Sequence, residues 1–366
     1  GSPSGAAAPR AVGGPFFNQL NYIFFNRLPS GTVKLSPATG GDKQVNGQIV
    51  GNSNNGFAPA YTETVKPRYG TVQLDKNTGT FIYTPNQAVV AAGITDHFTV
   101  TVDNGTNAQL DGLAGMVQNT LHEWAIEMGL AEKDTVKIEV DITIDGTNKY
   151  GNLDNAKYWV KQSYMNCQLM SSAMAVAQVL QIPTPSEETM VARARTTDSV
   201  RQPGYKMYGG EDTQDGAYGD DAVVLMETYW PVTAELTQYG TRDENGDLAS
   251  VTIRDTEDAL SDLKVALASG YGATVGVDSN TVWTAVGGSP LSDFPNYLDG
   301  AGHAVAVIYI DQPAGFVYLN DSGPEYGRAE KVPIGAFMRA WQVDGLELTV
   351  VKAKPKDEAD SQSVGA

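Results

Sequence analysis

The chain has 366 residues, with 43 acidic against 25 basic side chains and a formal net charge of -18. Such an acidic surface repels phosphate backbones, so we expect no nucleic-acid partner. Because no apolar run reaches the length of about eighteen residues that spans a bilayer, we expect no membrane insertion. The length and the 41% hydrophobic content allow two or three globular domains.

Residues 1–30 are rich in Ala, Pro and Gly, and then in Asn and Phe. This composition predicts an extended N-terminal arm with little core of its own. Gly1-Ser2 resembles an expression scar, so we expect a signal peptide on the natural N-terminus rather than in this sequence.

From residue 31 to residue 102, short alternating runs are separated by turn clusters, which predicts a β-sandwich. Residues 69–74, 77–86 and 95–102 resemble the Gly-Thr-Val, Gly-x-Phe-x-Tyr-x-Pro and Asp-x-Phe-x-Val-x-Val pattern of bacterial Ig-like, cadherin-type repeats. The resemblance implies an Ig-like β domain on a secreted or cell-surface protein, with a cell-surface partner bound through this domain.

A helix is predicted over residues 110–130, where Leu110, Leu113, Val117, Leu121, Trp124 and Met128 recur every three to four positions. Residues 136–144 alternate and predict a half-buried strand. We assign both to the first domain, residues 31–146, whose sheet the strand completes. Alternatively, the helix and strand form an insertion between two domains. A linker is expected over residues 145–156.

Cys167 is the only cysteine, and it precedes the apolar run 171–180, which predicts a helix with one buried stripe. Peptide N–H groups at a helix start carry partial positive charge, which favours thiolate over thiol. Cys167 is therefore a candidate nucleophile. The alternative is a small buried hydrophobic residue.

A thiol nucleophile needs a base that is close in space. His97 lies in a predicted strand and His122 in a predicted helix. His303 differs, because it follows Gly300-Ala301-Gly302 and opens the apolar run 304–310. His303 is therefore the candidate base.

The apolar runs 304–310 and 316–320 predict an antiparallel hairpin across a loop that contains Pro and Gly. If paired residue numbers sum to 624 or 626, Asp321 lies on the same face as His303 and Asn320 points away. If the pairing register shifts by one residue, Asn320 lies on the face of His303 and Asp321 points away. Either side chain can accept a hydrogen bond from an imidazole N–H and orient the ring.

Residues 167–174 resemble the Cys-Gly-Pro-x-Ser-x-Ala-Met signature of the C39-like branch of papain-fold cysteine peptidases. The segments 263–278, 302–307 and 320–323 resemble the stretch before the family's histidine, its Gly-His-hydrophobic segment and its Asn-Asp-Pro-Gly turn. The resemblance covers roughly residues 155–345. It implies an α+β papain-like cysteine peptidase domain over residues 155–350.

The resemblance also implies roles for individual residues. Cys167, His303 and Asp321 match the catalytic triad, with Asn320 as the alternative third member, and Gln162 is assigned as the oxyanion donor although it lies one position closer to the cysteine than in the family. Gln168 and Leu169 replace the family's Gly and Pro, a change that reshapes or obstructs the substrate groove. No metal ion or organic cofactor is required.

The acidic segment 211–216 and Asp220-Asp221 offer carboxylates to a calcium ion, but the closing Glu of a calcium loop is missing. We therefore expect a solvated loop without metal. Residues 243–247 predict a hairpin turn. Residues 353–366 are rich in Pro, Lys, Asp and Ser and predict a disordered tail.

The sequence thus predicts a multidomain protein: an N-terminal Ig-like β-sandwich followed by an α+β papain-like cysteine peptidase domain. The predicted function is that of an exported cysteine peptidase, which hydrolyses a peptide-type amide through a Cys-His-Asp triad and a thioester intermediate. One alternative is a papain-like domain that has lost catalysis and acts with the Ig-like module as a surface binding or adhesion protein. Another is acyl transfer to an amine.

Overall fold

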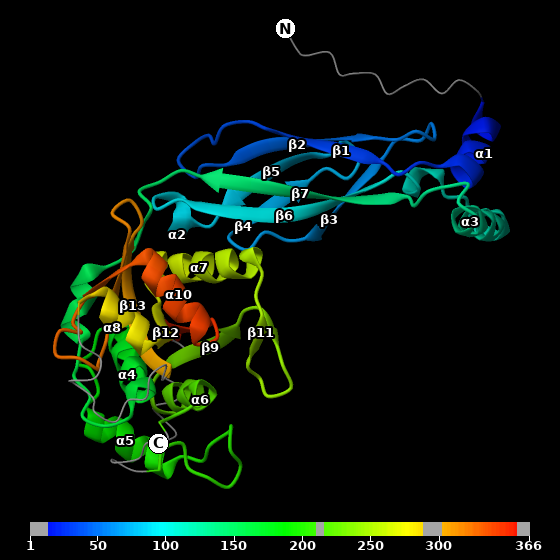
Figure 1. Ribbon diagram of the computed structural model, residues 1–366. Helices are drawn as coiled ribbons and strands as arrows, with labels where there is room; N and C mark the ends of the chain where they lie inside the picture. The colour runs from blue at the N-terminus through cyan, green and yellow to red at the C-terminus, as the bar shows by residue number, and fades with distance from the viewer. Residues whose placement is uncertain (1–13, 210–215, 288–301, 357–366) are drawn as a thin grey trace. The chain divides into compact units, whose positions relative to one another are not determined.

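The computed structural model describes residues 14–209, 216–287 and 302–356. The chain divides into two compact units, Gly1–Gly146 and Thr147–Ala366, and contains several antiparallel sheets together with helices (Figure 1). The elements of the first unit are α1 (Pro15–Phe25), β1 (Ser30–Leu35), β2 (Val45–Asn52), β3 (Ala60–Val65), β4 (Gly70–Leu74), β5 (Thr80–Pro85), α2 (Gln87–Val90), β6 (Ile94–Asp103), η1 (Thr106–Ala108), α3 (Gly112–Glu127) and β7 (Thr135–Ile144).

Two antiparallel sheets form most of the first unit, with strand orders β1-β2-β5-β4 and β3-β6-β7. Along β6 every second residue is buried, as expected when one face of a sheet is covered. Side chains from both sheets form one hydrophobic cluster, so the two sheets enclose a common core. The predicted strand over residues 136–144 is confirmed, since β7 pairs with β6 along its whole length.

The side chain of Asp96 links several segments of the first unit at the end of the core where β6 begins. Its carboxylate is fully buried and accepts hydrogen bonds from the Arg68 N–H at 3.0 Å, the Tyr69 N–H at 2.9 Å and the Tyr83 hydroxyl at 2.8 Å. A buried carboxylate is tolerated when several donors satisfy its oxygens. The three segments that carry the Ig-like sequence pattern therefore meet at one side chain.

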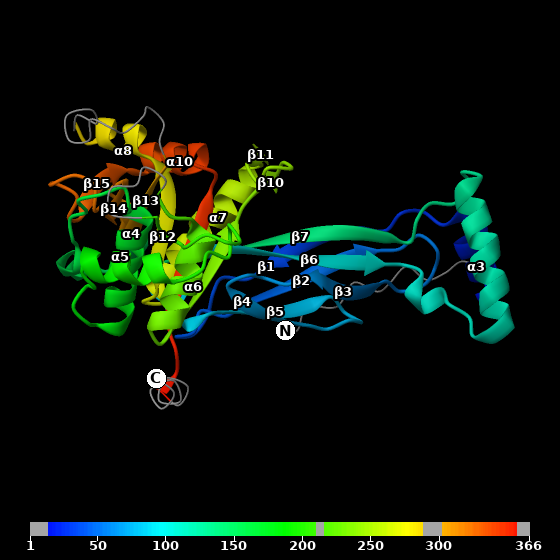
Figure 2. The ribbon, with the colours of Figure 1, turned by 90° about the horizontal axis from the view of Figure 1, so that it is seen from below.

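The prediction of an extended arm over residues 1–30 is wrong for residues 15–25, which form the helix α1. Pro15 stands at the first helical position, where its missing N–H costs nothing. One side of this apolar helix packs on α3, with Tyr22 fully buried, whereas Phe16, Phe17 and Phe25 stay exposed. Residues 1–13 lie outside the described residues. The helix pair α1–α3 lies at the end of the first unit where β7 begins (Figures 1 and 2).

The second unit combines a seven-stranded sheet, helices and a small two-stranded sheet formed by β10 and β11. The strand order is β15-β14-β13-β12-β16-β9, and β8 pairs with β13 beside this path. Its elements are β8 (Lys149–Gly151), η2 (Leu153–Tyr158), α4 (Cys167–Leu180), α5 (Glu187–Thr196), α6 (Gly219–Tyr229), β9 (Val232–Gln238), β10 (Thr241–Arg242), β11 (Leu248–Ser250), α7 (Ile253–Ala268), β12 (Gly272–Asp278), α8 (Ser279–Ala285), β13 (Gly302–Asp311), β14 (Phe316–Asn320), β15 (Glu330–Pro333), α10 (Ile334–Val343) and β16 (Glu347–Ala353).

The expected linker over residues 145–156 is wrong in its second half. Residues 149–151 are the strand β8, whose Tyr150 is buried, and residues 153–158 form the 3₁₀ helix η2. β8 pairs with β13 and so belongs to the sheet of the second unit. Of the predicted tail over residues 353–366, residues 357–366 lie outside the described residues.

Helix α4 lies at the centre of the second unit and packs against β12, β13 and β16. Every residue from Leu169 to Ala177 is buried, which is the pattern of a helix enclosed on all sides rather than amphipathic. A Cβ atom at Gly272 of β12 would stand 3.0 Å from the Ala175 carbonyl oxygen, so glycine permits this close approach. The buried helix gives Cys167, its first residue, a rigid support.

Two predicted hairpins are confirmed. β13 and β14 pair antiparallel across residues 312–315, and β10 and β11 pair across residues 243–247.

Within the described part of the chain, no helix is both long enough and apolar enough to cross a membrane.

Candidate active site

Cys167 is the first residue of α4 and is half-buried. The backbone N–H of Ala304 donates to its Sγ at 3.4 Å, which places the start of β13 beside the sulfur. N–H groups in the first turn of a helix have no acceptor within the helix, and their partial positive charge stabilises a thiolate. The predicted position of Cys167 in the first turn of a helix is confirmed.

His303 stands near the start of β13 with only 1% of its surface exposed. Its Nε2 lies 2.5 Å from Oδ1 of Asp321. The hairpin pairs Ala306 with Asn320, which is one of the two registers expected to put Asp321 on the face of His303. Asn320 points elsewhere: its Nδ2 donates to the Asn155 carbonyl and its Oδ1 accepts from a backbone N–H.

The contact with Asp321 fixes the tautomer of the imidazole. An ionised carboxylate only accepts hydrogen bonds, so Nε2 of His303 must carry the proton that lies between them. Nδ1 is then the ring nitrogen that can take up or release a proton during a reaction. The backbone N–H of Ala304 donates to the sulfur, so the backbone next to His303 lies close to Cys167.

Asp321 is fully buried, and besides His303 its carboxylate accepts hydrogen bonds from two N–H groups. Nε1 of Trp283 donates to Oδ2 at 2.8 Å, and the N–H of Gly323 donates to Oδ1 at 2.9 Å. Burial by itself raises the pKa of Asp321, but the charge of His303 and the hydrogen bonds from His303, Glu330 and Trp283 outweigh burial and lower the pKa to about 2. Asp321 therefore remains ionised throughout the neutral range.

Glu330 is a second buried carboxyl group next to Asp321. It is 3% exposed, and neither of its oxygens receives a hydrogen bond from a donor group among the described residues. Burial raises its pKa to about 10, and the negative charge of Asp321 adds to the effect. Because two adjacent carboxylates cannot both ionise in a buried site, Glu330 holds the shared proton and donates it in a hydrogen bond to Asp321.

Asp344 is a third carboxyl group near the histidine. Added Cβ atoms at Gly276 and Gly302 would stand 2.2 Å and 2.5 Å from its carboxylate oxygens, so the two glycines make room for it. Burial and the charge of Glu347 raise the pKa of Asp344 to about 7, while His303 opposes the shift. A side chain at Gly302, the residue before His303, would therefore collide with Asp344.

Gln162 is buried and is tied to the strand end that carries Asp321. Its N–H donates to the Ser322 carbonyl at 2.8 Å, and its Oε1 accepts from the Ser322 hydroxyl at 2.6 Å. Its Nε2 donates to the Tyr164 carbonyl at 2.9 Å. An amide nitrogen carries two hydrogens, so this side chain retains a second donor.

Glu187 of α5 holds the loop that leads into Cys167. Its Oε1 accepts from the Ser163 N–H at 2.7 Å, the Tyr164 N–H at 3.2 Å and the Asn166 side chain at 2.7 Å. Three donors on one carboxylate oxygen fix the position of the loop. Glu187, from the helix that follows α4, therefore positions the loop that ends at Cys167.

Gln168 and Leu169 take separate positions. Leu169 is 1% exposed and belongs to the hydrophobic core around α4, so its side chain is not accessible to a substrate. Gln168 is half-buried, and its carbonyl accepts hydrogen bonds from the hydroxyls of Ser171 and Ser172. Of the two departures from the family signature, only Gln168 lies where it could affect a substrate.

Three residues of the site were not predicted from the sequence: Trp283, Glu330 and Glu187. Besides its hydrogen bond to Asp321, the Trp283 ring meets the His303 ring edge to face, with centroids 5.4 Å apart. Each of them reaches the site from another helix or strand, and no local pattern marks them. Only the pairing of β15 with β14, which aligns Glu330 with Leu319, brings Glu330 next to Asp321.

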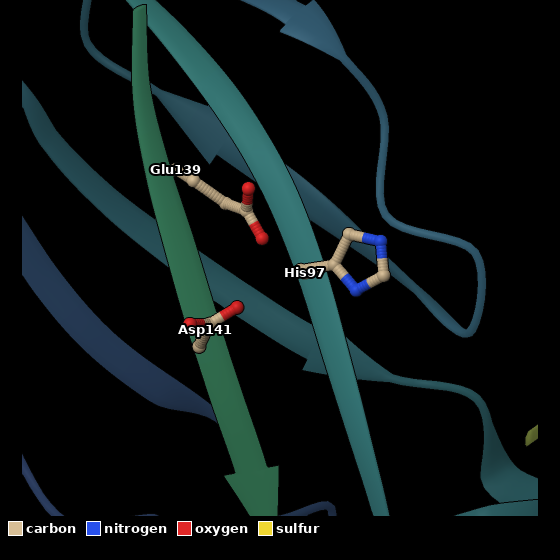
Figure 3. Close-up of side chains that lie close together, drawn as sticks. All are labelled: His97, Glu139 and Asp141. Carbon is tan, nitrogen blue, oxygen red and sulfur yellow. The ribbon is translucent and has the colours of Figure 1, made fainter. Parts of the chain in front are cut away.

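Among the described residues, one group of side chains has the composition of a metal site. On the outer face of β6 and β7, His97, Glu139 and Asp141 have ligand atoms within 4.8 Å of one another (Figure 3). His97 pairs directly with Asp141 across the two strands. A nitrogen and two carboxylates suit a cation such as zinc, but no further feature of the described residues points to a bound ion. The acidic segment 211–215, for which calcium was considered, lies outside the described residues.

No family model matches the chain. Among solved structures, a crystal structure from Bacillus anthracis, provisionally described as a C39-like peptidase, aligns with a TM-score of 0.37 and 15% identity, covering 57% of this chain and 99% of the other. Among curated proteins, "Uncharacterized protein Rv1268c" of Mycobacterium tuberculosis and "Uncharacterized protein Mb1299c" of Mycobacterium bovis are each 31% identical over 191 residues, which is 51% of this chain and 76% of theirs. The chain therefore belongs to the same family as these mycobacterial proteins.

Proposed function

We propose that the chain is a cysteine peptidase that hydrolyses a peptide-type amide, with Cys167 as nucleophile, His303 as base and acid, and Asp321 as the residue that orients His303. The proposal rests on two hydrogen bonds. One joins His303 to Asp321, and the other runs from the N–H of Ala304, the residue after His303, to the sulfur of Cys167. A nucleophile beside a base that a third group orients is the arrangement that acyl transfer requires.

In the acylation step, the thiolate of Cys167 attacks the carbonyl carbon of the scissile amide and forms a tetrahedral intermediate. The Cys167 backbone N–H and the Gln162 side chain donate to its oxyanion. Each such donor contributes about 3 kcal/mol to transition-state stabilisation in other enzymes. The imidazolium of His303 then gives its Nδ1 proton to the leaving amine, the C–N bond breaks, and a thioester remains on Cys167.

In the deacylation step, His303 takes a proton from water, which attacks the thioester carbon. The second tetrahedral intermediate collapses, the C–S bond breaks, and the carboxylic acid product leaves. Asp321 stays ionised and keeps His303 oriented in both steps, in line with its pKa of about 2. No metal or organic cofactor takes part in this scheme.

The proposal includes export and an Ig-like first domain. The Ig-like assignment is supported by the pattern residues Tyr69, Tyr83 and Asp96, which come together in one buried hydrogen-bond cluster. A secreted or surface-attached enzyme would act on peptides or proteins outside the cell and would use the first domain to bind a surface partner.

Mass spectrometry of peptide mixtures incubated with the full chain tests the activity. We expect cleavage products, with new carboxyl termini labelled by ¹⁸O in H₂¹⁸O. If an added amine takes the acyl group in place of water, the enzyme is a transferase. If many unrelated peptides remain intact and no thioester forms on Cys167, the binding-protein alternative is favoured.

The buried acid Glu330 predicts a specific pH dependence of stability. Its folded-state pKa of about 10 lies above the unfolded value near 4.5, so the folded state binds the extra proton and loses stability as pH rises between these values. The slope is up to about 1.4 kcal/mol per pH unit for one proton. Glu330→Gln keeps a donor for Asp321 and removes the slope, so we expect the variant to match the wild type near pH 5 and to exceed its stability near pH 9.

Urea unfolding followed by tryptophan fluorescence from about pH 5 to pH 9 measures this difference. The control is Glu325→Gln, which removes an exposed carboxyl group from the same loop region. A stability difference between wild type and Glu330→Gln that stays constant with pH would show that Glu330 is ionised in the folded protein.

A further inference from the structure

The helix α3 turns its apolar stripe outward. The residues that the sequence spaces every three to four positions are exposed to solvent, with Leu113 79% exposed, Val117 58% and Trp124 49%. The full stripe consists of Leu113, Met116, Val117, Leu121, Trp124 and Met128. A helix in a globular domain normally buries this stripe against the core, so the exposed stripe indicates a missing partner.

The inner side of α3 is small and polar, and its contacts lock the helix in this orientation. Nε2 of Gln118 donates to the Ala108 carbonyl at 2.8 Å, and the two nitrogens of His122 contact the Ile23 carbonyl at 2.9 Å and Asp134 Oδ1 at 2.6 Å.

At Gly115 an added Cβ would stand 2.0 Å from the Leu110 carbonyl oxygen. Rotating the helix to bury its apolar stripe would break these hydrogen bonds and force a side chain into the space beside Gly115. The stripe is therefore exposed because the inner face of α3 is already specified.

The neighbouring helix α1 adds apolar area to the same pair of helices. Phe16, Phe17 and Phe25 are each more than half exposed, and α1 contains no charged residue. An aromatic side chain presents about 150–250 Å², so together with the stripe the helix pair offers on the order of 1,000 Å² of apolar surface. This reaches the roughly 800 Å² per partner that a stable interface requires.

We propose that the surface formed by α1 and α3 binds a second copy of this chain, with the two α3 helices antiparallel about a two-fold axis near Leu121. This arrangement sets Leu113 against Met128 of the second copy and Val117 against Trp124 of the second copy. Two α1–α3 pairs then form a four-helix bundle, and a two-fold axis is the symmetry of most homodimers.

The charges at the start of α3 favour a second copy of this chain as the partner. The first turn of α3 contains no acidic residue, and the side chain of Asp111 makes no capping hydrogen bond there, so its N–H groups keep their partial positive charge. In the proposed antiparallel register, Glu127 of one copy lies opposite the first turn of α3 in the other copy, where its negative charge meets these N–H groups.

Sedimentation equilibrium of the full chain over about a hundredfold range of concentration tests the proposal. We expect a species of twice 39.0 kDa. The double variant Val117→Glu, Trp124→Glu should dissociate at least about 100-fold more readily without a loss of helical circular dichroism, because both side chains are exposed in the single copy. The control Ile253→Glu changes a residue that is 80% exposed on α7 and should leave the dimer intact.

A second variant examines the geometry directly. Leu121→Cys in a Cys167→Ala background should oxidise to a cross-linked dimer, whereas a cysteine at Thr106 should not. A monomer at every concentration, an equal effect of Ile253→Glu, or a monomer that co-sediments with phosphatidylcholine–phosphatidylglycerol vesicles would each overturn the proposal. All of these outcomes are independent of peptidase activity.

Discussion

The variant Cys167→Ala is expected to lose peptide hydrolysis by about 10⁵- to 10⁶-fold, because removing the nucleophile of a catalytic triad disables the whole unit. The sulfur accepts a hydrogen bond from the Ala304 N–H, and the helix behind it is held by a buried core that the substitution does not touch. We therefore expect the free energy of unfolding to change by about 1 kcal/mol or less.

Turnover of a cleaved peptide by the purified variant, beside its urea unfolding curve, measures both quantities. Cys167→Ser is the matched control for the chemistry, since it keeps a hydroxyl of similar shape but a much weaker nucleophile. If Cys167→Ala hydrolyses the peptide as fast as the wild type, the assignment of the nucleophile is wrong.

The second large effect is expected at Asp321. Replacing it with Asn removes one of the two acceptor oxygens, while the N–H groups of His303, Trp283 and Gly323 still require acceptors. Either one donor loses its partner, or His303 changes tautomer and presents the wrong nitrogen to Cys167. In serine proteases the corresponding change lowers kcat by about 10⁴-fold, and we expect a loss of about 10²- to 10⁴-fold here.

Asn320→Ala is the matched control, because the neighbouring side chain points away from His303 and bonds the Asn155 carbonyl. We expect it to lower stability by roughly 1–2 kcal/mol through the lost hydrogen bonds, with kcat/KM nearly unchanged. Steady-state kinetics and unfolding of both variants separate the two effects. The roles of Asp321 and Asn320 would be exchanged if the Asn320 variant lost activity and the Asp321 variant kept it.

The buried carboxyl groups of the site also predict how the stability of the folded protein changes at acidic pH. The pKa of Asp321 lies near 2, below its unfolded value near 3.9, so its contribution to stability is present above about pH 4 and is lost as pH falls toward 2. Glu330 acts in the opposite direction, because its raised pKa costs stability as pH rises above about 4.5. The pair therefore favours folding most strongly near pH 4 to 5.

Much of the fold could be predicted from local patterns. Alternating residues specified β6 and β7, and the turn signals around residues 243–247 and 311–315 located two hairpins. Helix α1 could not be predicted from its flanking composition, because Gly and Pro at residues 13–15 suggested a loop although Pro15 begins a helix. The outward stripe of α3 escaped prediction as well, since spacing shows that a helix has an apolar face but not what covers that face.

The candidate site was partly predictable. Cys167 and His303 are marked by their places at a helix start and a strand start, and the hairpin register selects Asp321. Trp283 and Glu330 were not predictable, because they reach Asp321 from α8 and β15 through tertiary packing alone. Their side chains determine the charge state of the site, which a linear sequence does not reveal.

The central claim is that His303 holds Cys167 as a thiolate, and the alkylation rate of Cys167 against pH tests it most directly. Free cysteine ionises near pH 8.5, whereas a cysteine paired with histidine can ionise several units lower. The account predicts fast labelling of the intact protein at about pH 5–6 and its loss in His303→Ala. Slow labelling that rises only above about pH 8, with the same profile in both proteins, would contradict it.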